Sequence, residues 1–536
     1  MAIIPVVQTT VISPFRSWVP TWLKILVAFS ILVPVLLING AYTGSNIDIS
    51  SYLGVLSEDI NMAYYASSAG MAIAHLIIPK VKPIATTKTI ILIVLLCQVF
   101  LSLICAETNY IEVIIVCSFL IGYFKAFSMI ETINILMPVL SPSNTRNEFY
   151  AKFYPITLAC GQLSLVLTAE LAYLYKWEYM YYFMILLLLV AIIAVVLCMA
   201  FARRLVHIPI KDIDWLSFFL VSACCMSIIY VCTYGKTMDW FASQKILIAT
   251  ILIPVTGWLF IRRQFSGHPF VDMSVLKNRN STVVYLLSFV LMFFASFSIL
   301  IYSYTNIVLR LDSTRVNELY LYMLPGFVVG GIICYYSYLK EIRMAWLIFI
   351  GFACFTISIG YLYFKVMPSG LYEDLYIPMF LRGIGMTTLF VSFAIYAIQG
   401  LSQKQLIYNA FFMITARSAI APAIGSSILT NWLYQLQQKN VTLLSQNIDT
   451  QNPLAMDQVT SSVNSTMAQG WSIEDAQRIA MNALYQKVQI QAVTVSIKTI
   501  LGWMLIMGII LLVLILLYFF QYKPVKLMKM GTDMSG

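Results

Sequence analysis

Two charged residues stand deep inside an apolar segment of this sequence. Residues 122–138 read GYFKAFSMIETINILMP, within the apolar run 111–139, and they include Lys125 and Glu131. A charge at bilayer depth costs roughly 2.5–3.5 kcal/mol, so such residues face a protein interior or a watery cavity. Asn134 follows Glu131 by three residues, which places both on one face of a helix. The three side chains therefore predict a polar stripe that faces a protein interior or a watery cavity.

Several roles remain open for these charges. Glu131 could carry an exchangeable coupling proton, because buried carboxyl groups can titrate near neutral pH. Lys125 could bind an anionic group of a substrate or keep Glu131 ionised. Alternatively, either residue could close a salt bridge between helices or extend toward the inner interface. On a helix the two lie about 9 Å apart along the axis and about 120° apart around it, so we do not expect them to pair with each other.

The composition is that of a membrane protein. The chain has 536 residues, of which 60% are hydrophobic and 10% charged, and its mean hydropathy is +0.85. Soluble domains have about 25% charged residues. We therefore predict an all-α polytopic membrane protein embedded in a lipid bilayer. Ten cysteines without a CxxC pair and three scattered histidines predict neither a metal site nor a cofactor.

Fourteen apolar segments are long enough to cross a bilayer as helices. They are 23–42, 60–79, 88–106, 111–139, 151–174, 179–202, 214–234, 245–262, 281–307, 316–339, 344–364, 374–400, 405–434 and 497–521. If both termini are cytoplasmic, the inner loops hold about twice as many Lys and Arg residues as the outer loops, as the positive-inside rule requires. The net charge of +10 thus reflects membrane topology, and we predict no binding of nucleic acid.

A weak internal repeat suggests the domain organisation. FLIGYFKAF (119–127) and FLRGIGMTT (380–388) align at an offset of 261 residues, and Leu140-Ser141 then coincides with Leu401-Ser402. Parallel repeats of this kind place a substrate path at their interface. We predict a cytoplasmic segment 1–22, a six-helix half 23–202, two extra spans in 203–263, a second six-helix half 264–521 and a cytoplasmic tail 522–536.

The longest polar segment, 435–496, is predicted to face the outer compartment. Ser472 and Asp475 form a capping-box pattern, and neither Pro nor Gly occurs between them and Gly502. We therefore predict a helix that starts near Ser472 and continues into the last span. The segment is either a binding element or a connector.

Several stretches resemble one transporter family. YGKTMDWFAS (234–243), VDMSVLKNRNSTV (271–283), FLRGIGM (380–386) and ARSAIAPAIGSSI (416–428) are similar to stretches of the fourteen-helix EmrB/QacA-type drug:proton antiporters of the major facilitator superfamily. The resemblance implies two six-helix halves plus two extra central spans, fourteen transmembrane helices in total. The chain departs from the family pattern at its first span, in the loop between spans two and three, and in its fifth span, which bears on proton coupling more than on the fold.

The resemblance also implies roles for single residues. Helices one, four, nine and twelve line the central cavity in that family, and the first of them usually carries an aspartate, where this chain has Asn39 and Asn46. Glu131 is then the proton-coupling candidate. The substrate-cavity candidates are Lys125, Asn134, Asn39, Asn46, Arg382, Tyr302 and Tyr396. The structural or gating candidates are Arg417, Gly383, Gly385, Asp239, Trp240 and Asn280.

These observations predict a secondary active transporter that exports amphipathic small molecules across the inner membrane, driven by the proton gradient through alternating access. A periplasmic membrane-fusion adaptor and an outer-membrane channel are possible partners of segment 435–496. An exporter or flippase of one metabolite or lipid is the near alternative. A transport-dead sensor or scaffold belongs to another class, and a polytopic membrane enzyme is disfavoured because no catalytic cluster is visible.

Overall fold

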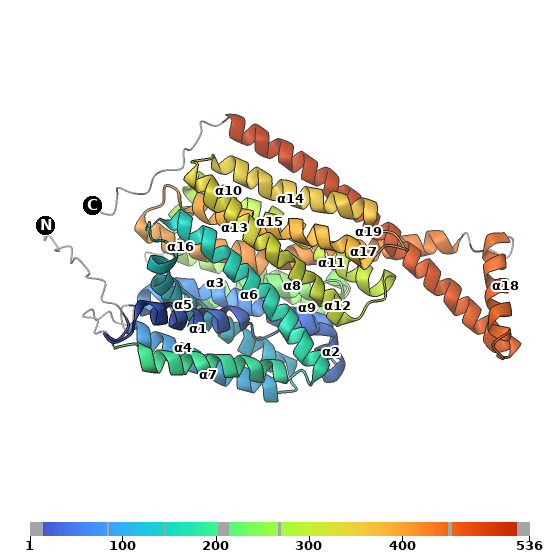
Figure 1. Ribbon diagram of the computed structural model, residues 1–536, viewed down its shortest axis with the longest axis horizontal. Coiled ribbons are helices and arrows are strands. Elements are labelled where there is room, and N and C mark those ends of the chain that lie inside the picture. Colours follow the sequence, from blue (N-terminus) through green and yellow to red (C-terminus); the bar gives the residue numbers. More distant parts are fainter. Residues whose placement is uncertain are drawn as a thin grey trace. The chain divides into compact units, whose positions relative to one another are not determined.

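The computed structural model describes residues 14–82, 85–143, 145–201, 214–265, 270–446, 448 and 453–521, and these fold almost entirely into helices (Figure 1). The predicted tail 522–536 and the first 13 residues lie outside the described residues. The helices are α1 (Thr21–Leu37), η1 (Thr43–Ser45), α2 (Asn46–Leu53), α3 (Ser57–Val81), α4 (Thr87–Glu107), α5 (Ile111–Leu140), α6 (Arg146–Leu174), α7 (Tyr179–Cys198), α8 (Trp215–Tyr234), η3 (Trp240–Ala242), α9 (Gln244–Gln264), η4 (Met273–Lys277), α10 (Arg279–Ala295), α11 (Ser298–Ser303), η5 (Tyr304–Val308), α12 (Ser313–Glu318), η6 (Leu319–Tyr322), α13 (Met323–Leu339), α14 (Met344–Lys365), η7 (Tyr372–Leu375), α15 (Tyr376–Ile398), α16 (Gln403–Ile414), η8 (Thr415–Ile420), α17 (Ala421–Ser445), α18 (Pro453–Met467) and α19 (Ile473–Gln521).

Each predicted apolar segment overlaps a helix. Twelve helical segments in the described part of the chain are long and apolar enough to cross a membrane. Two predicted spans are not among them: α1 has only 17 residues, and α3 is rich in Ser and Ala. The all-helical multi-span architecture is therefore confirmed, whereas the count of fourteen crossings stays a prediction.

The chain forms two compact units. The first contains the residues up to Phe289 together with Val391–Ala423, and the second contains Val290–Phe390 with the described part of Ile424–Leu527. Such units reflect how closely the segments pack and do not define a membrane topology, so the predicted division into two six-helix halves stays a prediction. Each unit is described by itself below.

In the first unit, α5 packs against α1, α3, α4 and α6. The closest approach is to α3, because glycines replace larger side chains at the crossing. A Cβ atom added at Gly70 would lie 2.0 Å from the Phe119 carbonyl oxygen, and one added at Gly122 would lie 1.8 Å from that of Ser67. Small residues at helix crossings let backbones approach closely in membranes.

The second unit contains a crossing of the same kind. A Cβ atom added at Gly326 on α13 would lie 2.3 Å from the Phe380 carbonyl oxygen, and one added at Gly383 on α15 would lie 2.5 Å from that of Met323. Phe380 and Gly383 are the residues that the offset of 261 aligns with Phe119 and Gly122. The two aligned motifs therefore sit at equivalent helix crossings, which supports the internal repeat.

The predicted helix from segment 435–496 into the last span is confirmed. Asp475 donates its backbone N–H to Ser472 Oγ at 3.2 Å, and Ser472 Oγ donates to Asp475 Oδ2 at 2.9 Å. The helix α19 then runs for 49 residues, about 74 Å at 1.5 Å per residue. That length exceeds a hydrocarbon core of about 30 Å. Its N-terminal part packs against α18, and both lie, with the end of α17, at the right of Figure 1 in a part that we call the projection.

Candidate functional site

The helix α1 ends at Leu37, in the interior of the first unit. Pro34 lies inside α1, Ile38 is extended with φ −72° and ψ 131°, and Gly40 has φ +77°. A Cβ atom at Gly40 would lie 2.7 Å from Ser118 Cα, so only glycine fits both the left-handed conformation and the space. We call the segment Leu36–Gly40 the α1 break.

Lys125 on α5 caps the α1 break. Its Nζ donates to the carbonyl oxygens of Leu36 at 3.1 Å and Ile38 at 2.8 Å, and to Asn39 Oδ1 at 2.8 Å. A lysine ammonium has three N–H donors, and all three have an acceptor here. The residue is only 8% exposed. A cation near the negative end of a helix dipole is stabilised, so the position of Lys125 suits its charged form.

Two further side chains each bind one more carbonyl oxygen of the α1 break. Ser164 Oγ on α6 donates to Leu37 O at 2.7 Å, and Tyr181 Oη on α7 donates to Gly40 O at 2.7 Å. Sequence reasoning missed both residues. Pro34 and the Asn39-Gly40 pair were the signals of an interrupted helix, but no local signal indicates which distant hydroxyl groups would reach it.

Glu131 lies six residues further along α5 and has different partners. Its Oε1 is 3.3 Å from Lys82 Nζ, and its Oε2 accepts a hydrogen bond from Thr87 Oγ1 at 2.8 Å. The residue is 3% exposed. As expected, Glu131 does not pair with Lys125: it ties the end of α3 and the start of α4 to α5.

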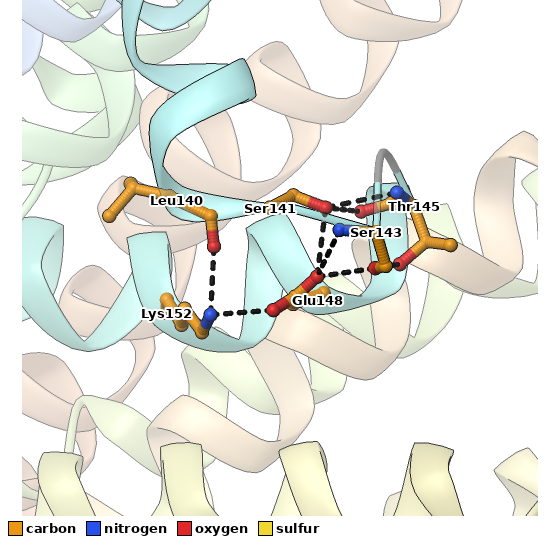
Figure 2. Close-up of polar contacts among 6 residues, drawn as sticks. All are labelled: Leu140, Ser141, Ser143, Thr145, Glu148 and Lys152. Atoms are coloured by element: carbon orange, nitrogen blue, oxygen red, sulfur yellow. Dashed lines mark hydrogen bonds and ion pairs between the residues drawn. The ribbon is translucent and has the colours of Figure 1, made fainter.

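The end of α5 is fixed by a polar network at the turn into α6 (Figure 2). Glu148 accepts hydrogen bonds from Ser141 Oγ at 3.2 Å and from both the backbone N–H and the hydroxyl group of Ser143. Lys152 Nζ donates to Glu148 Oε1 at 2.6 Å and to Leu140 O at 2.9 Å. This network caps the helix that carries Lys125 and Glu131.

The other predicted cavity residues do not all gather around Lys125. Asn39 does, through its contact with Nζ. Asn46 Nδ2 instead donates to Asn61 Oδ1 at 3.2 Å. Asn134 is exposed although Glu131 is buried, so the two do not line one buried wall. Tyr396 in the first unit is buried, and Tyr302 in the second unit is 38% exposed.

In the second unit, Arg382 on α15 reaches the end of another interrupted helix. Its Nη2 donates to the Ala295 carbonyl oxygen, the last of α10, at 2.9 Å, and its guanidinium group lies 5.0 Å from the Phe297 ring centroid. The residue is 7% exposed, and Nε and Nη1 have no hydrogen-bond partner among the described residues. We call Ala295–Phe297 the α10 break.

The predicted structural residues occupy helix contacts and turns. A Cβ atom at Gly385 would lie 2.8 Å from Gly351 O, which explains why α15 needs glycine there as well as at Gly383. Arg417 lies in the π-helical turn η8 and stacks on the Tyr154 ring at 5.3 Å. Such π-helical turns often mark functional sites.

Asp239 and Trp240 form the turn between α8 and α9. Both have φ +52°, and the Trp240 backbone N–H donates to Gly235 O at 2.7 Å. Asn280, on the first turn of α10, donates its backbone N–H to Asn278 Oδ1 at 3.0 Å. Their contacts in the first unit are those of turn and cap residues.

Directly before the first residue of α8, Asp214 caps that helix and pairs with Arg263. Arg263 Nε donates to Asp214 Oδ2 at 2.8 Å and Nη2 to Oδ1 at 3.0 Å. Partial burial alone would raise the pKa of Asp214, but hydrogen bonds from Arg263 and Ser217 outweigh it and lower the pKa to about 2. Among the described residues, no group of three His, Cys, Asp or Glu side chains could hold a metal ion.

Comparison with known proteins identifies curated relatives of low identity. The colistin resistance protein EmrB of Acinetobacter baumannii is 24% identical over 414 residues, covering 75% of this chain and 77% of that protein. The multidrug export protein EmrB of Escherichia coli is 24% identical over 231 residues, covering 41% and 43%. The Haemophilus influenzae protein of the same name is 22% identical, covering 47% and 49%. The chain thus spans less than half the length of the last two.

Solved structures and a family profile define the fold. A crystal structure of a POT peptide transporter in complex with sulfate has a TM-score of 0.50 and 12% identity, covering 91% of this chain and 94% of that one. A second proton-dependent oligopeptide transporter structure has a TM-score of 0.50 at 11% identity, covering 92% and 99%. The profile of the Major Facilitator Superfamily matches residues 25–426, about three quarters of the sequence. The chain therefore belongs to the major facilitator superfamily.

Proposed function

We propose that this protein is a secondary active transporter that exports amphipathic organic compounds. The observation that carries the proposal is the match to the Major Facilitator Superfamily over residues 25–426, together with relatives named multidrug export protein and colistin resistance protein. A transporter of this superfamily needs two alternating arrangements of its helices and a source of free energy. We take that source to be the proton gradient.

The proposed membrane arrangement has fourteen crossings with both termini cytoplasmic, in the inner membrane of a cell with two membranes. Its support is the excess of Lys and Arg in the inner loops, the twelve long apolar helices, and the two further helices α1 and α3. The repeated glycine crossings, Gly122 and Gly383, favour two six-helix halves around the extra spans α8 and α9.

We place the coupling proton on α5, the helix that carries two buried charges. Glu131 is the candidate predicted from the sequence, and Lys125 is the other titratable group. Substrate would contact polar and aromatic side chains of the first, fourth, ninth and twelfth spans. The candidates are Lys125, Asn134, Asn39, Asn46, Arg382, Tyr302 and Tyr396, while Arg417, Gly383, Gly385, Asp239, Trp240 and Asn280 shape helix contacts and turns.

A periplasmic adaptor and an outer-membrane channel are proposed partners. The support is the length of α19, whose 49 residues are more than twice the roughly 20 that one crossing needs, and the packing of α18 on it. Exposed apolar side chains on this projection, Trp471, Met481 and Tyr485, are of the kind that protein interfaces bury. Co-purification of the full chain with an adaptor encoded beside its gene tests this point.

The transport proposal is tested in efflux-deficient cells. Expression of the wild-type protein should lower the accumulation of amphipathic dyes, and an uncoupler should abolish the difference. Glu131→Gln and Lys125→Met, matched for surface expression, then show which charge coupling requires. If wild type changes the accumulation of no compound in a broad panel, drug export is wrong, and an exporter or flippase of one metabolite or lipid, or a transport-dead sensor, becomes the better interpretation.

A further inference from the structure

The ammonium group of Lys125 is a buried positive charge whose hydrogen-bond acceptors are all neutral. It is 8% exposed and donates to two carbonyl oxygens and one amide oxygen. The ion pairs within 4 Å among the described residues do not include it. The acceptor dipoles at the α1 break offset the cost of burying this charge. The balance between charged and neutral forms is therefore set by the geometry of the break.

The protonation state of Lys125 determines how many hydrogen bonds it can donate to the α1 break. A charged lysine has three N–H groups, and the α1 break offers three acceptors at 2.8–3.1 Å. A neutral amine has two N–H groups and a lone pair, so one acceptor would lose its donor and face a lone pair instead. Loss of the proton would therefore weaken the binding of the Lys125 amine to the α1 break.

The backbone of the α1 break leaves the helix after Leu37. Ile38 is extended and Gly40 is left-handed, so neither belongs to a regular helix that would resist a change. Within the break, Leu36 O and Ile38 O depend on Lys125, whereas Leu37 O and Gly40 O have hydroxyl partners on α6 and α7. Release of Lys125 frees the two carbonyl groups that it holds, while Leu37 O and Gly40 O keep their hydroxyl partners.

The neighbouring titratable groups do not take over this role. Cys160 on α6 is the titratable side chain that interacts electrostatically with Lys125. Glu131 is held by Lys82 and Thr87. The other buried titratable groups on the helices around α5 have partners of their own: His75 on α3 contacts Met71 O, Lys88 on α4 donates to Val196 O and Met199 O, and Cys105 on α4 pairs with Cys117 on α5.

The α10 break offers an internal comparison. Ala295 and Arg382 are separated by 87 residues, as are Ile38 and Lys125. In both repeats a cation on the fourth helix binds the end of the first. An arginine guanidinium does not lose its proton in proteins, whereas a buried lysine can. Only the α1 break can therefore change its charge.

We infer that Lys125 carries the exchangeable proton of the transport cycle, and that the α1 break is the site that binds its charged form. This inference rests on the proposed proton-coupled export. In the release step the Nζ–H bond breaks, the proton passes to water of one compartment, and the electron pair stays on nitrogen. In the return step a proton from the other compartment binds that lone pair, and the ammonium group closes the break again.

The first test measures proton exchange and does not depend on transport. The purified full chain in detergent is titrated potentiometrically as wild type, Lys125→Arg and Lys125→Met. In the neutral pH range where a coupling group must exchange its proton, wild type should exchange one proton more than either variant, since a permanent cation and a neutral side chain both lack the exchangeable proton. An unchanged proton count in this range overturns the inference, whatever the transport assays show.

The second test separates coupling from substrate movement. Proteoliposomes are loaded with ethidium, a cationic probe, or 8-anilinonaphthalene sulfonate, an anionic one. Lys125→Arg and Lys125→Met should lose export driven by a pH gradient at least about tenfold, yet one of them should keep gradient-free exchange of the probe. Lys88→Met removes another buried lysine that caps a helix end and serves as the matched control. It should keep both activities. Glu131→Gln is assayed beside it, because Glu131 is the competing candidate for the coupling proton.

The outcomes distinguish the inference from the proposed function. Gradient-driven export that persists in both Lys125 variants overturns the inference and leaves proton-coupled export intact. Loss of such export in Glu131→Gln alone moves the proton to Glu131 and also overturns it. A wild type that exports neither probe counts against the proposed function, and the titration then decides alone whether Lys125 exchanges a proton.

Discussion

The α1 break and the α10 break both receive a cation from a residue 87 positions further along the chain, yet they are built differently. At the α1 break the chain leaves the helix for an extended and then a left-handed residue. At the α10 break it makes one tight turn, with Phe297 at φ −60° and ψ −11°, and continues as α11. An unwound segment exposes several carbonyl groups, whereas a tight turn exposes few.

The cations at the two breaks also differ in how many of their N–H groups find an acceptor. Lys125 uses all three of its donors, but Arg382 uses one nitrogen while Nε and Nη1 have no hydrogen-bond partner among the described residues. Arg382 also lies one turn earlier relative to the aligned glycine: it precedes Gly383 by one residue, and Lys125 follows Gly122 by three. The α1 break therefore has a lysine cap that uses all of its donors, whereas the α10 break has an arginine cap that uses one nitrogen, at a position that the offset of 261 does not align with Lys125.

The largest loss of stability is expected at the glycine crossings, which the two aligned motifs share. Gly122→Ala and Gly383→Ala should each destabilise the protein by about 3 kcal/mol or more, because the added methyl group overlaps a backbone oxygen of the crossing helix. Gly161→Ala is the control: nothing lies within 4 Å of its added Cβ atom, and alanine favours a helix by about 1 kcal/mol. Thermal unfolding in detergent measures all three. If only one of the two glycines can be replaced by alanine without loss of stability, the two helix crossings are not equivalent.

The next effect separates the two cations. Lys125→Met leaves two buried carbonyl oxygens without a donor, and we expect a loss of about 2–5 kcal/mol in the free energy of unfolding. Arg382→Met removes one hydrogen bond together with a poorly satisfied buried charge, so its cost should be about 1 kcal/mol or less. Unfolding temperatures of the two variants give the comparison. Equal losses would mean that the α10 break depends on its cation as strongly as the α1 break does.

A smaller effect sharpens the description of the α1 break. Ser164→Ala and Tyr181→Phe each remove the hydroxyl group that binds one carbonyl oxygen, and each should cost about 1 kcal/mol. Ser128→Ala is the control, because its hydroxyl group binds carbonyl oxygens of its own helix that are already paired. If both variants match Ser128→Ala in thermal unfolding, the break does not rely on these hydroxyl groups.

The smallest effect concerns a partly exposed ion pair that neither break uses. The folded-state pKa of Asp214 is about 2, below its ordinary value of 3.8, so the pair with Arg263 contributes stability above about pH 4 that is lost as the pH falls toward 2. The unfolding temperature of Asp214→Asn should differ from wild type by a constant small amount between pH 5 and pH 8, and the difference should shrink below pH 4. A difference that grows on acidification would assign the group another role.

Much of the fold could be predicted from local patterns. The apolar segments, the capping box at Ser472 and the glycine-containing repeat at Phe119 and Phe380 each have a signal within a few residues, and the structure has a helix, a helix start and a helix crossing at those places. The separation of Lys125 and Glu131 also followed from helix geometry alone. Asn134 is exposed although it was predicted to share a face with the buried Glu131. Helix periodicity specifies which residues share a face, but it does not specify which neighbouring helices bury that face.

What the sequence by itself determined is therefore the class of protein: apolar segments of bilayer length must become helices, because only a helix satisfies its own backbone within one segment. The tertiary structure decided which groups Lys125 and Glu131 bind. Lys125 binds carbonyl oxygens 87 and 89 residues away, and Glu131 meets Thr87, 44 residues away. Those partners are brought together by the packing of α1, α3 and α4 on α5, and no local pattern contains them.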